Sequence, residues 1–190
     1  LQQKASSEHN YSPSETMSIC QKLYEGSFIT YMRTDVTRLS DEFVNEAMLH
    51  IESEFGKQYL GSYKTTKDAN AQDAHEGIRP TKLSFTPDYV KQHVDKASIK
   101  DEKLFDDAMK LYHRIYGRTL ASLMAPAILE HTKVTFTSNQ HDFTMKGIRL
   151  VFDGFLKVYE ESKNKDVILP KFNQGQQILM DDIISIEKQT

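Results

Sequence analysis

The sequence is poor in cysteine, with Cys20 the only one among its 190 residues. A single thiol cannot form a disulfide within the chain, and it cannot supply the several cysteine ligands of a structural zinc site. This scarcity excludes the disulfide-stabilised class of small domains and favours a reducing compartment.

Long apolar runs and a strong charge imbalance are absent too. No hydrophobic run reaches the roughly 20 residues of a membrane-spanning helix, and the first residues do not resemble a signal peptide. We therefore expect no membrane partner. The formal net charge of −3 does not indicate a nucleic-acid-binding protein. It does not exclude one either, because a local basic cluster can act within an acidic chain.

The composition that is present suits a globular protein of one domain, or one and a part. Hydrophobic residues make up 38% of the chain and charged residues 27%, which is enough apolar material for a core. The chain begins without Met and ends within a strand-like alternation. We expect it to be a piece of a longer protein.

The first two thirds of the sequence are patterned for helices. Ser12, Pro13 and Glu15 form a capping-box start, and Gly26 ends that helix. Residues 28–32 form a short strand candidate. The expected helices cover residues 12–25, 40–55, 87–93 and 101–123.

After Pro126 the apolar pattern changes from helical to strand-like spacing. The expected strands are separated by turn residues, namely Asn139, Gly147, Gly154 and Gly175. We therefore predict an α+β fold, with a helix-rich domain over residues 1–124 and a β-rich segment over residues 125–190. The second segment is small for a free-standing β domain.

Tyr31 lies two residues before Arg33 and four before Asp35. On the order of 0.1% of a free tyrosine is phenolate at neutral pH, so a nucleophilic tyrosine needs a nearby cation or proton acceptor. Arg33 could supply that charge and hold a phosphate oxygen, with Asp35 orienting it. On this pattern alone, a packed strand tyrosine beside charged neighbours is the favoured interpretation.

A second polar cluster covers residues 72–81 and contains His75, Glu76 and Arg79. A histidine and an arginine presented from a turn can both donate to the non-bridging oxygens of a phosphodiester. A solvated polar turn explains the same residues. Zinc binding is disfavoured, because no cysteine or second histidine lies at metal-ligand spacing.

Five segments are informative when they are taken together and in their order along the chain. They are LQQKAS (1–6), QKLYEGSFITYMRTD (21–35), DAHEGIRPT (73–81), LYHRIYGRTLASLMAPA (111–127) and FDGFLKVY (152–159). Together they resemble the central part of the bacterial type IA DNA topoisomerases, in particular topoisomerase I. ITYMRTD is the most specific of these motifs, and HEGIRPT is the second.

The resemblance implies that Tyr31 is a catalytic nucleophile. It would attack a phosphodiester of single-stranded DNA, form a 5′-phosphotyrosine link, and allow strand passage and relaxation of negative supercoils without ATP. Arg33 matches the arginine that contacts the scissile phosphate. His75 matches the histidine that binds DNA phosphate and assists cleavage.

Other positions match residues that support such a site. Thr30 and Asp35 match positions that line it, and Gln21 and Glu25 match a supporting pair one helical turn apart. Arg79 is expected to contact a DNA phosphate.

Two residues depart from the family pattern. Val36 stands where serine is usual, and Gly77 stands where alanine is common. Val36 motivates a further alternative, an inactive relative with a scaffolding role.

The resemblance also implies what other parts of a parent enzyme would supply. The family binds Mg²⁺ through an acidic toprim domain, and this sequence shows no such pattern. Asp106 and Asp107 are interpreted as the solvated face of a helix, and the pair Asp181 and Asp182 lacks a third carboxylate. We expect no metal site and no cofactor in this chain, and no DNA relaxation by the chain in isolation.

The implied architecture is a winged-helix (CAP-like) domain carrying Tyr31, followed by part of a β-rich arch. The expected partners are single-stranded DNA and the remaining domains of the parent topoisomerase, in a cytoplasmic, nucleoid-associated location. The main alternative is a non-catalytic winged-helix module that binds DNA.

Overall fold

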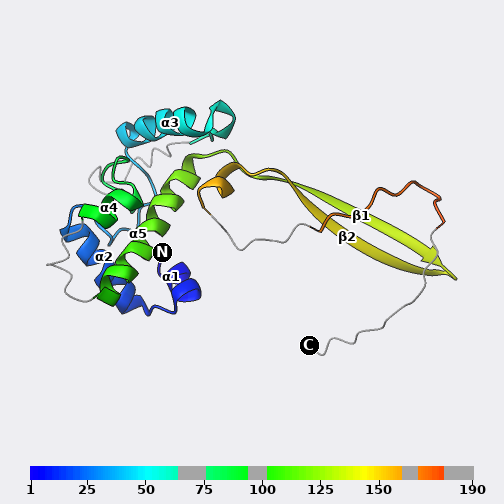
Figure 1. Ribbon diagram of the computed structural model, residues 1–190, viewed down its shortest axis with the longest axis horizontal. Helices are drawn as coiled ribbons and strands as arrows, with labels where there is room; N and C mark the ends of the chain where they lie inside the picture. Colours follow the sequence, from blue (N-terminus) through cyan, green and yellow to red (C-terminus); the bar gives the residue numbers. More distant parts are fainter. Residues whose placement is uncertain (64–75, 94–101, 160–166, 178–190) are drawn as a thin grey trace. The chain divides into compact units, whose positions relative to one another are not determined.

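A computed structural model describes residues 1–63, 76–93, 102–159 and 167–177, and it is helical up to Leu123 with a two-stranded sheet after it (Figure 1). The predicted α+β class is confirmed. In chain order the elements are α1 (Gln2–His9), α2 (Pro13–Glu25), α3 (Asp41–Phe55), the 3₁₀ turn η1 (Lys57–Tyr59), α4 (Pro87–His93), α5 (Glu102–Leu123), β1 (Ile128–Ser138), β2 (His141–Phe152) and the 3₁₀ turn η2 (Gly154–Lys157).

The helices begin where their capping residues predict. At the start of α2, the Ser12 hydroxyl accepts a hydrogen bond from the Glu15 amide at 3.2 Å, and the Glu15 carboxylate accepts one from the Ser12 amide at 2.8 Å. The Ser40 hydroxyl likewise accepts from the Phe43 amide at 3.4 Å and begins α3. These bonds satisfy backbone donors that have no partner within the first helical turn.

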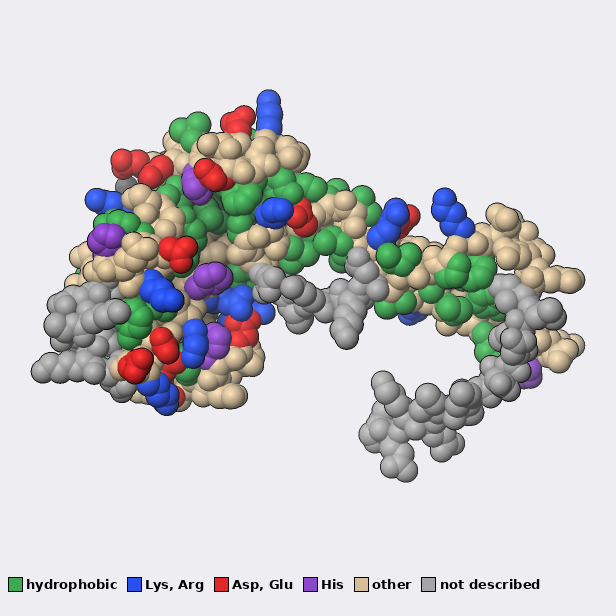
Figure 2. Space-filling view, in the orientation of Figure 1, with side chains coloured by type: hydrophobic (Ala, Val, Ile, Leu, Met, Phe, Trp, Pro, Cys, Tyr) green, Lys and Arg blue, Asp and Glu red, His purple; other side chains and the backbone are tan. Residues whose placement is uncertain are grey.

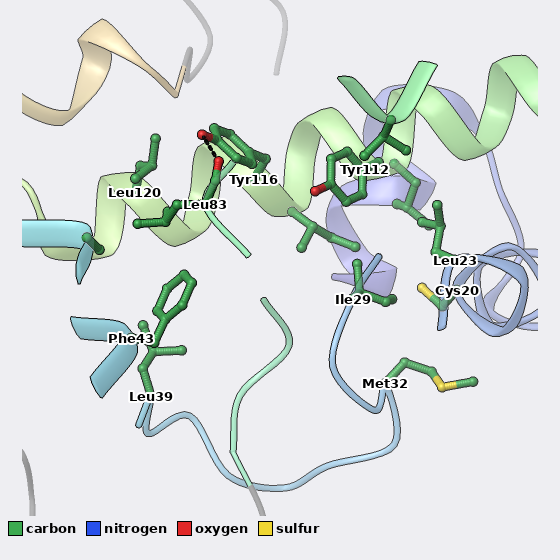
Figure 3. Close-up of a cluster of buried hydrophobic side chains, with 14 of the residues drawn as sticks. Cys20, Leu23, Ile29, Met32, Leu39, Phe43, Leu83, Tyr112, Tyr116 and Leu120 are labelled. Carbon is green, nitrogen blue, oxygen red and sulfur yellow. Dashed lines mark hydrogen bonds between the residues drawn. The ribbon is translucent and has the colours of Figure 1, made fainter. Parts of the chain in front are cut away.

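The core of the helical part forms around α5, which packs against α2, α3 and α4. Figure 3 shows part of the cluster of buried side chains, to which α2 contributes Leu23, α3 contributes Phe43 and α5 contributes Tyr112. The Tyr112 hydroxyl donates to the Phe85 carbonyl at 2.5 Å, and the Tyr116 hydroxyl donates to the Leu83 carbonyl at 3.0 Å. Both tyrosines therefore contribute buried apolar area without leaving a buried hydroxyl unpaired.

The sheet is a hairpin of β1 and β2. Its turn residues, Asn139 and Gln140, have φ angles of 48° and 67°, which is the left-handed pair of a two-residue type I′ turn. The turn expected at Asn139 is confirmed, but the strand break expected at Gly147 is wrong, because Gly147 lies within β2. A Cβ at Gly147 would lie 2.7 Å from the Val167 carbonyl oxygen, so this glycine permits a neighbouring segment to approach closely.

The chain divides into two compact units. The helical unit comprises Leu1–Ile128 and Phe152–Lys163, and the hairpin unit comprises Leu129–Val151 and Asn164–Thr190. The domain division at residue 124 stays a prediction. The strand expected near residues 176–182 lies mostly outside the described residues. In the parts of the chain that the structure describes, no helix is both long and apolar enough to span a bilayer.

Candidate active site

Tyr31 lies in irregular backbone just beyond a single β-bridge between Ile29 and Pro80. The strand expected over residues 28–32 is therefore wrong beyond that bridge. The chain enters the bridge through Ser27, which has a φ of 61°, and Phe28 packs edge-on against Phe85. Because the pairing ends before Tyr31, this residue is not covered by a neighbouring strand, and it is 49% exposed.

The Tyr31 loop, residues 31–38, is tied at both ends to residues 77–79. At its start, the Thr30 hydroxyl donates to the Gly77 carbonyl at 2.9 Å and accepts from the Arg79 amide at 3.0 Å. At its end, the Gly77 amide donates to the Arg38 carbonyl at 2.7 Å. Thr30 thus acts as an anchor of the loop that presents Tyr31.

Tyr24 packs against Tyr31, a contact that the sequence pattern did not predict. The two rings meet edge to face, with centroids 5.3 Å apart and planes at 67°. Tyr24 follows Leu23 at the end of α2 and is 41% exposed. Its position seven residues before Tyr31, in the last turn of a helix, is a weak signal that the loop can fold back onto it.

The predicted supporting pair, Gln21 and Glu25, is in contact. The Gln21 side-chain amide donates to the Glu25 carboxylate at 3.0 Å, and Lys22 pairs with the other Glu25 oxygen at 3.2 Å. The hydrogen bond from Gln21 and the charge of Lys22 lower the pKa of Glu25. Glu25 therefore stays ionised at neutral pH near the helix end that carries Tyr24.

Arg33 and Asp35 are exposed side chains of the Tyr31 loop. Among the described residues, no ion pair joins the two, so the expected orientation of Arg33 by Asp35 stays a prediction. An exposed guanidinium two residues from an exposed phenol can reach an oxygen of a bound phosphate.

Arg79 is mostly buried, with 12% of its side chain exposed, and it pairs with Glu76. His75 lies outside the described residues. The chain after Arg79 is bound to the segment before Tyr31, since the Thr81 amide donates to the Phe28 carbonyl at 3.0 Å. Within the HEGIRPT motif, Gly77, Arg79 and Thr81 therefore form the hydrogen bonds that hold the Tyr31 loop and the segment before it.

The two residues that depart from the family pattern are Val36, which lies on the Tyr31 loop, and Gly77, which is hydrogen-bonded to both ends of that loop. Val36 lines a groove of about 540 Å³ that also reaches Arg114, Arg118 and Tyr159. A Cβ at Gly77 would lie 3.3 Å from the Thr37 carbonyl oxygen. Alanine would fit there only if the loop shifts by a few tenths of an ångström.

The described residues include no group of three or more His, Cys, Asp or Glu side chains that could hold a metal ion. The expectation that this chain holds no metal stays a prediction. The solvated interpretation is wrong for Asp107, which is buried and accepts a hydrogen bond from the Tyr11 hydroxyl at 2.5 Å. Burial alone would raise the pKa of Asp107. The hydrogen bonds from Tyr11 and Lys110 lower the pKa by more than burial raises it, so the net shift is downward. Asp181 and Asp182 lie outside the described residues.

One anchored loop therefore presents an exposed phenol, on Tyr31, and an exposed guanidinium, on Arg33. The family model described as DNA topoisomerase matches residues 1–190. The chain therefore belongs to the DNA topoisomerase family, and the predicted resemblance to bacterial type IA topoisomerase I is confirmed.

Three relatives show how much of such a protein the chain covers. It is 42% identical to DNA topoisomerase 1 of Campylobacter jejuni in an alignment of 194 positions, which covers 96% of this chain and 26% of the relative. It is 38% identical to DNA topoisomerase 1 of Helicobacter pylori in an alignment of 196 positions, which covers 97% of this chain and 25% of the relative. The structure of full-length topoisomerase I from Thermotoga maritima matches with a TM-score of 0.74 and 34% identity, over 92% of this chain and 28% of that one. The chain spans about a quarter of the length of these relatives.

Proposed function

We propose that this chain carries the nucleophile of a type IA DNA topoisomerase and that the nucleophile is Tyr31. The observation that carries the proposal is the exposed phenol of Tyr31 on a loop anchored at both ends, in a chain that belongs to the topoisomerase family. Anchoring supports catalysis because a nucleophile held near its target loses little entropy on reaction.

In the proposed step, the phenolic oxygen of Tyr31 attacks the phosphorus of a phosphodiester in single-stranded DNA. The new bond joins that oxygen to phosphorus, and the bond from phosphorus to the 3′-oxygen breaks. The phenol loses its proton and the departing 3′-oxygen gains one, so charge and protons balance. The link is a 5′-phosphotyrosine, and its reversal reseals the strand after another strand has passed through.

Arg33 and His75 complete the proposed site on this chain. The Arg33 guanidinium stabilises the charge that develops on the phosphate oxygens during attack. His75 donates to a DNA phosphate and helps to set the cleavage geometry. Gln21, Glu25 and Asp35 support the residues that touch the phosphate.

Activity of the whole protein would depend on parts that lie beyond these residues. Mg²⁺ belongs, in this proposal, to a toprim domain of the parent enzyme. The proposal is supported by the described residues, among which no group of three or more His, Cys, Asp or Glu side chains could hold a metal ion. The proposal includes a cytoplasmic, nucleoid-associated location and an isolated chain that does not relax DNA.

The first test uses Tyr31→Phe in the full-length protein that contains this chain. The protein is mixed with a labelled single-stranded oligonucleotide and Mg²⁺ and then denatured, and covalent protein–DNA adduct is measured. We expect adduct from the unmodified protein and none from Tyr31→Phe, because phenylalanine lacks the attacking oxygen.

Tyr89→Phe is the matched control, since Tyr89 is also exposed but belongs to α4. It should leave the adduct unchanged. Adduct formation by Tyr31→Phe would refute the proposal. Oligonucleotide binding without any adduct from the unmodified protein would instead favour the non-catalytic DNA-binding module.

A further inference from the structure

The Arg79 guanidinium donates hydrogen bonds to a side chain and to backbone carbonyls of the protein itself. Its Nε donates to one Glu76 carboxylate oxygen at 2.8 Å, and its Nη2 donates to the other at 2.8 Å. Its Nη1 donates to the Pro80 carbonyl at 2.8 Å and to the Thr81 carbonyl at 3.2 Å. Arginine has five N–H donors, and these four bonds occupy all but one of them.

The surroundings of Arg79 reinforce this arrangement. The guanidinium carbon lies 4.2 Å from the centre of the Phe43 ring, which belongs to the first turns of α3. Glu76 also accepts a hydrogen bond from the Ser40 amide, at 3.4 Å, where α3 begins. The pair of Glu76 and Arg79 therefore joins the start of α3 to the segment that anchors the Tyr31 loop.

A DNA phosphate could bind Arg79 only by displacing these contacts. A two-pronged pair between arginine and a carboxylate is among the strongest hydrogen-bonded arrangements in proteins, and breaking it would leave the Glu76 carboxylate without its main partner. The backbone of Arg79 holds the loop directly, since its carbonyl accepts from the Thr30 amide at 2.9 Å. Fixing the side chain of Arg79 thus fixes the backbone to which Thr30 is bound.

We propose that Glu76 and Arg79 are positioning residues that form a clasp for the Tyr31 loop and that Arg79 does not bind DNA. The proposal rests on the proposed function of Tyr31, and it replaces the expected contact between Arg79 and a DNA phosphate. A clasp acts on the orientation of Tyr31 and Arg33, so it changes the rate of cleavage rather than the affinity for DNA.

The test compares Arg79→Lys and Glu76→Gln in the full-length protein. Lysine keeps the positive charge but lacks the planar fork, and glutamine keeps the size of glutamate but loses its charge. Each variant should lower the single-turnover rate of adduct formation by about 10- to 100-fold, since a misplacement of roughly 1 Å can cost about that much. The dissociation constant for the oligonucleotide, and its dependence on salt, should stay unchanged.

A direct phosphate contact gives a different result. Arg79→Ala would then weaken oligonucleotide binding and reduce the slope of log affinity against log salt by about 1, whereas Glu76→Gln would not slow cleavage. That outcome overturns the clasp. The matched control is the exposed pair of Arg149 and Glu130 on the hairpin, 2.5 Å apart, where Arg149→Lys should change neither rate nor affinity.

Thr30 provides a second pair of variants in case the clasp variants fold poorly. Thr30→Ser retains the hydroxyl that bonds Gly77 and Arg79 and should keep most of the cleavage rate. Thr30→Val keeps the shape without the hydroxyl and should reproduce the loss of rate at unchanged affinity. Equal rates for the two Thr30 variants would count against the clasp.

Amide hydrogen exchange separates failure of the clasp from failure of the proposed function. Absence of adduct from the unmodified protein refutes the function, and the clasp is then decided by exchange alone. Arg79→Lys should speed exchange of the Thr30 and Arg79 amides by about 10-fold or more, with no change in the helical core, because local opening exposes only the bonds it breaks. Unchanged exchange at these two amides would refute the clasp.

Discussion

The helical unit and the hairpin unit differ in how far their apolar side chains are buried. In the helical unit, Ile51, Leu111 and Tyr112 are completely buried. In the hairpin, Leu150 is 38% exposed and Val151 is 56% exposed. Figure 2 shows hydrophobic side chains open to solvent along the hairpin.

This difference indicates two sources of stability. A fully buried Leu or Ile side chain contributes about 1.5–3 kcal/mol, so the helical unit is stabilised by its core. A two-stranded hairpin is marginal in water by itself, so its conformation depends on its turn and on cross-strand contacts. The hairpin also has a contact from outside its two strands, since Phe136 of β1 packs edge to face on Phe172, which follows β2 in the sequence, with centroids 5.3 Å apart.

The largest effect should come from removing a core side chain of the helical unit. Leu111→Ala should lower its free energy of unfolding by about 3 kcal/mol, because a cavity remains where the buried side chain was. Denaturant titration followed by far-ultraviolet circular dichroism measures this change. Leu129→Ala, at a position 41% exposed in the hairpin unit, should cost about 0.5 kcal/mol or less. Similar losses for both variants would mean that the two units do not differ in this way.

Features set by neighbouring residues were predictable from the sequence. Ser12 with Glu15 defined the start of α2, and Asn139 defined the hairpin turn, because the atoms involved lie within a few residues of one another. The same holds for α3, where Phe43, Ala47 and Ile51 recur every four residues along the sequence and are all buried.

Features set by distant residues were not predictable from local pattern. Asp107 is buried, and its hydrogen-bond donor Tyr11 lies 96 residues away in the sequence. The strand expected near Tyr31 is a single bridge, because the partner segment around Pro80 pairs with only one residue there. Spacing alone favoured a structural role for Tyr31, and the family motifs, rather than the spacing, identified it as the proposed nucleophile.

A medium effect should come from the capping box of α2, which tests whether local signals also contribute to stability. Ser12→Ala should cost the helical unit about 1 kcal/mol, because the Glu15 amide loses its acceptor. The same denaturant titration measures it. Ser14→Ala is the control, since Ser14 is an exposed residue at the second position of α2 and should tolerate the change. An Ser12→Ala variant as stable as the unmodified chain would show that the core alone determines where α2 begins.

The smallest effect concerns the hairpin turn, and it should be confined to the hairpin unit. Gln140 has a φ of 67°, and a non-glycine residue in this region costs about 1 kcal/mol or more. Glycine avoids this cost but loses about 0.5–1 kcal/mol of additional chain entropy, so Gln140→Gly should stabilise the hairpin by a few tenths of a kcal/mol at most. Asn-Gly is also the preferred pair for a type I′ turn. Amide exchange across β1 and β2 should slow slightly in Gln140→Gly and not in Gln140→Ala, which removes the side chain without relieving the backbone. Slower exchange in α5 as well would show that the two units are energetically coupled, and the contrast between a core-stabilised unit and a turn-dependent one would then have to be abandoned.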